Sequence, residues 1–457
     1  MSATGDMHEL LIQGGRVVSD GKVVRADVAI SKGIIAAVGP DLDVAAERII
    51  DASDGFVLPG ILDVHTHPVY LDDLHGLSVT AAHGGVTTLI HYAYAKPGSG
   101  LLETIQRFRE EGEGGSLLDF ALHGGLFDPK NQSHEIPDAV HEGVTSFKMF
   151  MTYAKLGWMT DDYQLMRTLD LIAQAGGLGM VHAENGLATD YLQDKTIAVK
   201  VDPKEAFLDT RPAVLEAEAI HRAIAMAQVA GCALYIPHMT AELGINVVAA
   251  ARTNGVCVYA ETCPQYLTLT HDDLLERGPL LKIGPPLRHE SDRAALWHAL
   301  ATGTIDTVAS DHAAKQKSED DPFFEAPYGS PQVETMLPLV FDAGIHEGRI
   351  TIERLVKTMC ENPARIFGLY PKKGTIRPGS DADVVVFDPR AECTITQSSQ
   401  HSHAPYTAYE GRTHRGAPTV VIARGEVLVE DDQLIGSGVR GRFHRTTAGR
   451  VSLSRLT

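Results

Sequence analysis

Six polar residues stand directly after short apolar runs in the middle of this 457-residue chain. Alternate residues of a β-strand point to the same side, so a His-x-His pair can chelate one cation from one face of a sheet. Imidazole nitrogens and carboxylate oxygens are common ligands of divalent metal ions. The pattern therefore predicts metal chemistry wherever the ends of these runs meet. The six residues are His65, His67, Lys148, His182, His238 and Asp311.

Each of these residues also has a simpler interpretation. A lone histidine at the end of a strand is more often a satisfied polar residue than a ligand, and Asp311 could cap a following helix. Four histidines and one aspartate at the ends of separate strands are much harder to explain in this way. Other histidines, among them His83 and His221, show no matching pattern, so we expect surface or capping roles for them.

Lys148 differs from the other candidates because an ammonium group repels a divalent cation. A buried lysine needs an ion pair or a route for its tip to the surface, because burial disfavours the charged form. Burial lowers the pKa of such a lysine and leaves a neutral, nucleophilic amine. That amine can add carbon dioxide and become a carbamate, an anionic ligand whose two oxygens can bridge two cations.

The apolar runs between residues 59 and 368 predict a parallel β-sheet. Helical stretches lie between most of them, and residues 216–229 and 242–252 show clear 3.6-residue periodicity. Continuous apolar strands that alternate with helices are typical of a parallel sheet covered on both faces. The eight runs are residues 61–64, 87–90, 117–122, 145–150, 178–181, 233–236, 256–259 and 305–309.

Eight strands are the number for a closed (β/α)8 TIM barrel, although the pattern alone also permits an open doubly wound sheet. Barrel enzymes build their sites at the carboxyl ends of several strands. Five of the eight predicted strands end on a candidate ligand, which favours the barrel.

The two ends of the chain have a different texture. Residues 9–58 form short apolar runs broken by turn sequences such as Asp20-Gly21, and similar runs return at 382–387 and 419–429. We therefore predict an α/β protein with a small β-sandwich domain built from residues 1–58 and 369–457, including a C-terminal tail. Residues 59–368 would form the catalytic barrel.

Composition excludes several classes of protein. The chain has 40 Lys+Arg against 59 Asp+Glu and a net charge of −19, which argues against nucleic-acid binding. Five cysteines without a CxxC pair argue against a disulfide framework. No apolar run approaches a membrane span, and Asp6, His8 and Glu9 interrupt the N-terminus where a signal peptide is apolar. We expect a cytoplasmic protein with no membrane partner.

These motifs together resemble the cyclic amidohydrolases, a family of hydantoinases, dihydropyrimidinases, allantoinases and dihydroorotases. The resemblance covers nearly the whole chain. GPPLR (284–288) and the long segment 361–389 are similar to the hydantoinase branch in particular. The segments that resemble the family's metal-binding strands are PGILDVHTHP (59–68), TSFKMFMTY (145–153), VHAEN (181–185), PHMT (237–240) and ASDH (309–312).

The resemblance implies two divalent metal ions, usually zinc, at the barrel mouth. One ion would be held by His65, His67 and Asp311, and the other by His182 and His238. Lys148, as carboxylysine, would bridge them. Relatives of this kind are commonly homotetramers or dimers.

The implied activity is opening of the C–N amide bond of a hydantoin- or dihydropyrimidine-like ring, to an N-carbamoyl amino acid or a similar product. Asp311 would orient the attacking hydroxide and move its proton. Tyr153 would donate a hydrogen bond to the developing oxyanion. The partner of such an enzyme is a small cyclic amide or ureide.

Two positions in the implied substrate site depart from the family pattern. Hydantoinases usually have serine where this chain has Gly284, and their Asn-Gly pair appears here as Tyr328-Gly329. We expect Tyr153, Gly284 and Tyr328 to contact the substrate in a pocket of altered shape. The exact ring is therefore open, and an allantoinase or a cyclic imide hydrolase is the alternative.

Other members of the superfamily fit the residues less well. Dihydroorotases place an arginine just beyond the His-x-His pair, where this chain has Pro68-Val69-Tyr70. Some relatives of dihydropyrimidinase are non-catalytic assembly proteins that have lost ligands, whereas all six positions are filled here. A deaminase with a single metal would lack the bridging lysine, so Lys148 argues against that class.

Overall fold

Eight parallel strands in sequence order form the centre of the molecule in this computed structural model, which describes residues 7–436, 441–448 and 456. Every residue of the eight strands is buried, which explains why the strands are largely apolar. The predicted strands are confirmed, although the strand predicted at 87–90 is longer in the structure and the one predicted at 305–309 is shorter. They are β6 (Ile61–Thr66), β7 (Val86–Ala95), β8 (Asp119–Leu126), β9 (Ser146–Phe150), β10 (Leu178–His182), β11 (Ala233–Ile236), β12 (Val258–Thr262) and β13 (Thr307–Val308).

The barrel closes between its first and last strands. Thr66 at the end of β6 forms a parallel bridge with His312, just beyond β13. The amide of His67 also donates to the His312 carbonyl over 3.0 Å. The open-sheet alternative is therefore wrong, and the predicted (β/α)8 barrel is confirmed.

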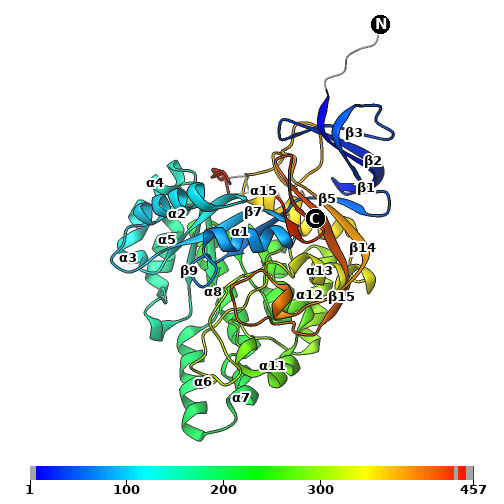
Figure 1. Cartoon of the computed structure of the whole chain (residues 1–457). Coiled ribbons are helices and arrows are strands. Elements are labelled where there is room, and N and C mark those ends of the chain that lie inside the picture. Colours follow the sequence, from blue (N-terminus) through cyan, green and yellow to red (C-terminus); the bar gives the residue numbers. More distant parts are fainter. Residues whose placement is uncertain (1–6, 437–440, 449–455, 457) are drawn as a thin grey trace.

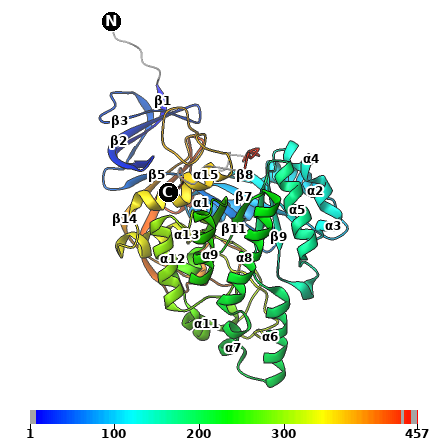
Figure 2. The same ribbon diagram turned by 180° about the vertical axis from the view of Figure 1, so that it is seen from behind.

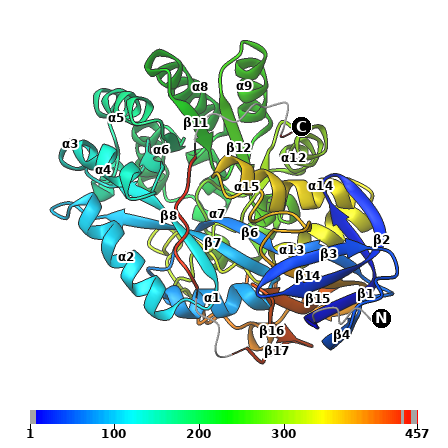
Figure 3. The ribbon, with the colours of Figure 1, turned by 90° about the horizontal axis from the view of Figure 1, so that it is seen from above.

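Helices surround this barrel, as the view along its axis shows (Figure 3). The two stretches with helical periodicity are confirmed as α8 (Ala213–Ala230) and α9 (Glu242–Thr253). None of the helices in the described residues has the length and apolar character to cross a membrane. The other long helices are α1 (Leu74–His83), α2 (Leu101–Gly115), α5 (Asp162–Gln174), α6 (Gly186–Val199), α7 (Pro203–Thr210) and α12 (Glu290–Thr302).

Shorter helices fill the loops and the far side of the barrel. Helix α11 lies with α6 and α7 at one end of the molecule, away from the second sheet (Figures 1 and 2). The short helices are α3 (Pro129–Gln132), α4 (Ile136–His141), α10 (Pro264–Thr268), α11 (His271–Arg277), α13 (Met336–Phe341), α14 (Ile352–Val356) and α15 (Asn362–Ile366).

A second, nine-stranded sheet is built from both ends of the chain, as predicted. Strand β5 pairs antiparallel with β14, which joins the two terminal segments, and blue and orange strands lie side by side in Figure 1. The strands are β1 (His8–Ser19), β2 (Lys22–Ser31), β3 (Ile34–Gly39), β4 (Ala46–Asp51), β5 (Phe56–Pro59), β14 (Val384–Thr394), β15 (Thr413–Ala423), β16 (Glu426–Glu430) and β17 (Gln433–Leu434).

Strand β1 continues through the pair Gly14-Gly15. The register with β2 shifts between Ile12 and Gly15, so the strand continues through a β-bulge. Gly14 has φ 71°, and a Cβ at Gly15 would lie 2.4 Å from Val57 Cγ2. The glycines therefore permit a bulge and a close approach of strands instead of ending the strand.

The C-terminal tail does not stay with the second sheet. Residues 441–448 run across the barrel beside β8 (Figure 3). The amide of Phe120 donates to Arg442 over 3.0 Å, and the amide of His444 donates back to Phe120 over 2.7 Å. The tail thus pairs with the beginning of β8, at the amino end of the barrel.

A buried cluster of charges ties the tail, the barrel and the second sheet together. The ammonium of Lys373 lies 2.7 Å from Asp119 on β8, 2.6 Å from Asp383 before β14 and 3.0 Å from Asp381. Asp119 also accepts from His444 of the tail over 2.9 Å. Burial acts to lower the pKa of Lys373, but the carboxylates of Asp383 and Asp119 hold it above its ordinary value. Lys373 is therefore a charged anchor between the two sheets.

We predict that Lys373→Met lowers the free energy of unfolding by about 3–5 kcal/mol, because it removes the buried cation that three carboxylates share. Urea-induced unfolding followed by circular dichroism measures this change. The neighbouring Lys372, whose side chain is 55% exposed, supplies the control. Lys372→Met should change stability by less than about 0.5 kcal/mol, and an equally small effect at Lys373 would contradict the anchor role.

Candidate metal centre

The structure brings the six predicted ligands together at the carboxyl end of the barrel. His65 Nε2 lies 3.1 Å and His67 Nε2 lies 2.8 Å from the same oxygen of Asp311. The three ligand atoms all lie within 4.8 Å of one another. Two imidazoles and one carboxylate from opposite ends of the strand order therefore surround one small volume that suits a cation.

Two partners orient the imidazoles of this group. His65 Nδ1 donates to Glu261 over 2.6 Å, and the Tyr94 hydroxyl lies 3.1 Å from His67 Nδ1. Hydrogen bonds of this kind fix which ring nitrogen faces a metal. Both Nε2 atoms are thereby directed at Asp311.

The protonation of this group shows what a cation would replace. Burial acts to lower the pKa of His65, but the carboxylates of Glu261 and Asp311 raise it to about 9. Burial lowers the pKa of His67 to about 4. A proton is thus held between His65 and Asp311, where a divalent ion bound to the neutral imidazoles could take its place.

The other three candidates lie against this group. The ring centroids of His182 and His238 are 4.4 Å apart, and those of His65 and His238 are 5.4 Å apart. Lys148 Nζ lies 3.4 Å from His238 Nε2. His182 Nε2 is turned to Glu184, 2.8 Å away, which leaves Nδ1 as its remaining ligand atom.

Lys148 is held in unusual surroundings for a lysine. It is 1% exposed, and its Nζ lies 5.4 Å and 5.6 Å from the ring centroids of Tyr92 and Phe150. Burial lowers its pKa to about 8, although Asp311 and Glu261 act in the opposite direction. A larger share of neutral amine is therefore present than in an exposed lysine.

Backbone strain coincides with this group. Tyr153, His238 and Asp311 have backbone φ angles of 65°, 43° and 52°. These lie in the left-handed region, which residues other than glycine rarely adopt. Each such residue costs about 1–3 kcal/mol, so the surrounding packing must hold it. Strain of this kind is commonly found at functional sites.

A cavity of about 380 Å³ opens from the predicted ligands. Aromatic side chains form much of its wall, and the segment 324–330 closes one side. It also contains the three predicted substrate-contact residues, Tyr153, Gly284 and Tyr328. Its aromatic lining includes Tyr70, Tyr94, Phe127, Phe150 and Trp158.

Comparison with known proteins agrees with this site. The family model described as "Amidohydrolase family" matches residues 56–428. The chain belongs to the amidohydrolase family.

Named relatives cover this amidohydrolase almost completely. A D-hydantoinase of Rhizobium radiobacter is 39% identical over 96% of the chain and 98% of the relative. An L-hydantoinase of Paenarthrobacter aurescens is 33% identical over 96% of the chain and 98% of that relative. Solved structures of a D-hydantoinase and of a dihydropyrimidinase from Brevibacillus agri NCHU1002 have TM-scores of 0.91 and 0.92, at 38% and 34% identity. The match to the D-hydantoinase structure covers 96% of this chain and 99% of that structure's chain. The match to the dihydropyrimidinase structure covers 97% of this chain and 100% of that structure's chain.

The two departures in the amidohydrolase pocket are physically linked. A Cβ at Gly284 would lie 3.1 Å from Cδ1 of Tyr328 and 3.2 Å from the Tyr153 hydroxyl. The Tyr328 hydroxyl in turn accepts from Arg211 over 3.0 Å, and Arg211 pairs with Glu184 over 2.8 Å. The absence of a side chain at position 284 therefore makes room for the Tyr328 ring.

Sequence reasoning missed Glu261, Glu184 and Arg211. Glu261 lies on β12, where it also accepts from Tyr235 over 2.7 Å and from the amide of His238 over 3.1 Å. An acidic residue inside an otherwise apolar strand was the available signal. Arg211 lies 27 positions beyond Glu184, and no spacing rule connects them.

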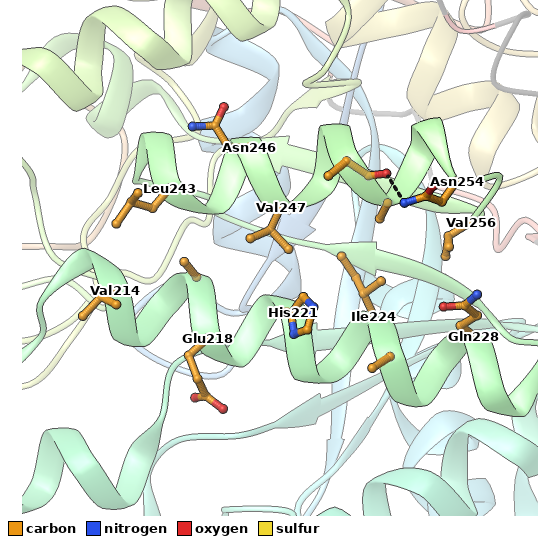
Figure 4. A pocket seen from close by; sticks show the side chains of 14 residues that line it. Val214, Glu218, His221, Ile224, Gln228, Leu243, Asn246, Val247, Asn254 and Val256 are labelled. Carbon is orange, nitrogen blue, oxygen red and sulfur yellow. Dashed lines mark hydrogen bonds between the residues drawn. The ribbon is translucent and has the colours of Figure 1, made fainter.

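Two other features of the described residues do not resemble this centre. A larger groove of about 660 Å³ lies on the outside of the barrel between α8 and α9, and Figure 4 shows mainly apolar side chains such as Val214 and Ile224 facing it. One of the two other groups of described residues that could hold an ion, Asp119, Asp381 and His444, already contains the Lys373 ammonium.

We predict that Glu261→Gln weakens metal binding by about 10- to 100-fold, because the imidazole of His65 loses the carboxylate that orients it. Competition with a chromophoric chelator measures the affinity. Glu276→Gln, an exposed change on α11, is the control and should bind as the unaltered protein does. Equal affinities for all three proteins would show that Glu261 does not position the ligand.

We also predict that Gly284→Ser lowers the free energy of unfolding by about 1–3 kcal/mol through overpacking against Tyr328. Tyr328→Asn should recover part of that loss in the double variant, because it removes the ring that the new side chain meets. A double-mutant cycle on urea unfolding gives the coupling. Strictly additive effects would mean that the two positions are independent.

Proposed function

We propose that this chain is a metal-dependent hydrolase that opens the C–N amide bond of a cyclic amide or ureide, with a hydantoin- or dihydropyrimidine-like ring. The product would be an N-carbamoyl amino acid or a similar acid. The observation that carries the proposal is the convergence of four histidines, Lys148 and Asp311 beside an aromatic cavity at the carboxyl end of the barrel. The names of the full-length relatives support the same reaction class.

The proposed centre holds two divalent ions, with zinc as the proposed metal. His65, His67 and Asp311 would hold one, and His182 and His238 the other. A carboxylated Lys148 would bridge them. The burial of Lys148 and its lowered pKa support this modification, in which the neutral amine forms an N–C bond to carbon dioxide and loses a proton.

Charge supports the same assignment. In the described part of the chain, no carboxylate forms a direct ion pair with Lys148, and the charges of Asp311 and Glu261 offset its burial only in part, because its pKa stays below the ordinary value. Conversion to an anionic carbamate would remove the repulsion between this side chain and a cation. It would also supply oxygen ligands to both halves of the centre.

The reaction requires a water activated close to neutral pH. Divalent ions bound at this centre would lower the pKa of that water and polarise the amide carbonyl of the ring. Asp311 would accept the proton of the attacking water while the new C–O bond forms. The same carboxylate would return the proton to the ring nitrogen as the C–N bond breaks.

Tyr153 would stabilise the carbonyl oxygen as negative charge develops on it. Burial keeps the pKa of Tyr153 well above its ordinary value, so its hydroxyl retains the proton that it must donate. Its ring centroid lies 5.2 Å from that of His182, beside the proposed second ion. Gly284 would present backbone groups to the ring, and Tyr328 would form the facing wall.

Tyr328 is also the observation that favours a second candidate function. A tyrosine in place of the asparagine usual in hydantoinases changes the shape and polarity next to the ring. An allantoinase or a cyclic imide hydrolase would fit such a change. The distinction lies in the substrate and not in the proposed chemistry.

The hydrolysis of a panel of rings tests the proposed function. We expect turnover of at least one compound among D- and L-hydantoins, dihydrouracil, allantoin and cyclic imides. Activity should fall to background after treatment with a chelator and return on addition of Zn²⁺ or Mn²⁺. Full activity in a protein shown by mass spectrometry to be free of metal would overturn the mechanism.

Lys148→Ala tests the proposed bridge. We expect loss of bound metal and a fall in kcat/KM of at least about 10³-fold, because one ligand of each ion disappears. A short carboxylic acid such as acetate or propionate should restore part of the activity. Lys130→Ala, which alters an exposed lysine outside the cavity, is the control. Undiminished activity in Lys148→Ala would exclude the bridge.

A further inference from the structure

The wall of the cavity contains a cation without an acidic partner. Lys315 lines the cavity together with Asp311, and its Nζ lies 2.9 Å from the ring centroid of Tyr70. Within the described residues, the Lys315 ammonium forms no hydrogen bond and no ion pair. Glu325, which lines the same cavity, does not pair with it. Lys315 therefore has a free charge beside the proposed reaction centre.

Lys148 belongs to the proposed metal centre, whereas Lys282 of the wall and Arg211, which holds the wall residue Tyr328, already have partners. Lys282 Nζ donates to the carbonyls of Phe324 over 2.8 Å and of Ala326 over 2.6 Å. Arg211 pairs with Glu184 over 2.8 Å. These two side chains maintain the shape of the wall, whereas Lys315 is left to meet a ligand.

The backbone around Lys315 is held in place. The amide of Leu71 donates to the carbonyl of Ala314 over 3.0 Å, and the amide of Ala313 donates to Ser330 over 2.9 Å. These bonds join the loops that follow β6 and β13 to the segment 324–330. The loops therefore keep Tyr70 and Lys315 together on one side of the cavity.

We propose that Lys315 binds an anionic substituent, a carboxylate, carried by the ring of the substrate. The inference rests on the proposed function, because it places the reacting amide at the metal centre and the substituent along the cavity wall. An ammonium that is partly removed from water is stabilised when an anion enters beside it. Burial lowers the pKa of Lys315 to about 8, with no acidic group offsetting that effect.

The aromatic lining agrees with an acidic substituent on a short linker. The aromatic side chains would pack against the ring and the linker of the substrate, and of the lysines that line the cavity Lys315 would select the end group. In a cavity with a largely aromatic wall, a well-placed polar group contributes strongly to specificity. An uncharged substituent of equal size would leave Lys315 desolvated and unpaired.

A matched pair of substrates tests this subsite. 5-(2-Carboxyethyl)hydantoin and 5-(2-carbamoylethyl)hydantoin have nearly the same shape and differ in charge. We expect the metal-loaded protein to prefer the acid in kcat/KM, measured separately for the D and L forms. Lys315→Met should lower the acid-to-amide ratio by about 10- to 100-fold, the value of a charged hydrogen bond.

Two further variants separate charge from packing. Lys315→Arg keeps the cation and should retain most of the preference for the acid. Lys96→Met alters an exposed lysine just beyond β7 that does not line the cavity, and it should leave the ratio unchanged. A ratio near one in the unaltered protein, or an equal ratio in Lys315→Met, would overturn the subsite.

Calorimetric binding of the same two compounds distinguishes failure of the subsite from failure of the proposed function. Preferential binding of the acid that is lost in Lys315→Met, without turnover of these compounds or of any other ring in the panel, would support the subsite and overturn the hydrolase proposal. Turnover of both compounds without a preference would support the hydrolase and overturn the subsite. Neither binding preference nor turnover would overturn both.

Discussion

The closure of the barrel and the assembly of the site depend on the same contact. His67 follows the first barrel strand and Asp311 follows the last, so the two residues are 244 positions apart in the sequence. His67 Nε2 nevertheless lies 2.8 Å from Asp311 Oδ1. The backbone bridge that closes the ring joins the adjacent residues, Thr66 and His312. The first and last strands must therefore pair correctly before the first group of ligands exists. A fold with non-local closure of this kind gives a site that forms only in the completed barrel.

Buried partners then extend from this contact in two directions. Glu261 orients His65 and also holds the amide of His238, so it connects the two halves of the predicted centre. On the other side, Glu184 links His182 to Arg211, and Arg211 reaches the Tyr328 hydroxyl in the cavity wall. The metal end and the substrate end are thus joined by hydrogen bonds between buried groups. Such networks are favourable only when every member has a partner, which explains how so many charges are tolerated here.

Much of this arrangement could be predicted from sequence because it depends on local patterns. Buried parallel strands are largely apolar, so all eight barrel strands were predicted, and His-x-His on one of them indicated a metal site. The partners of the ligands could not be found in this way. Glu261 acts through residues on other strands, and the fit of Gly284 to Tyr328 depends on three-dimensional packing. The crossing of the tail beside β8 likewise rests on contacts between Phe120 and residues more than 300 positions away. The domain limits at residues 58 and 369, and the roles of the individual ligands, stay predictions.

The central claim is that six side chains hold two ions with a modified Lys148 between them. Anomalous X-ray diffraction at the zinc absorption edge, on crystals of the zinc-loaded protein, tests it most directly. The account predicts two anomalous peaks, one beside His65, His67 and Asp311 and one beside His182 and His238, with carbamate density on Lys148 between them. A single peak, or an unmodified Lys148 whose Nζ contacts neither ion, would contradict it.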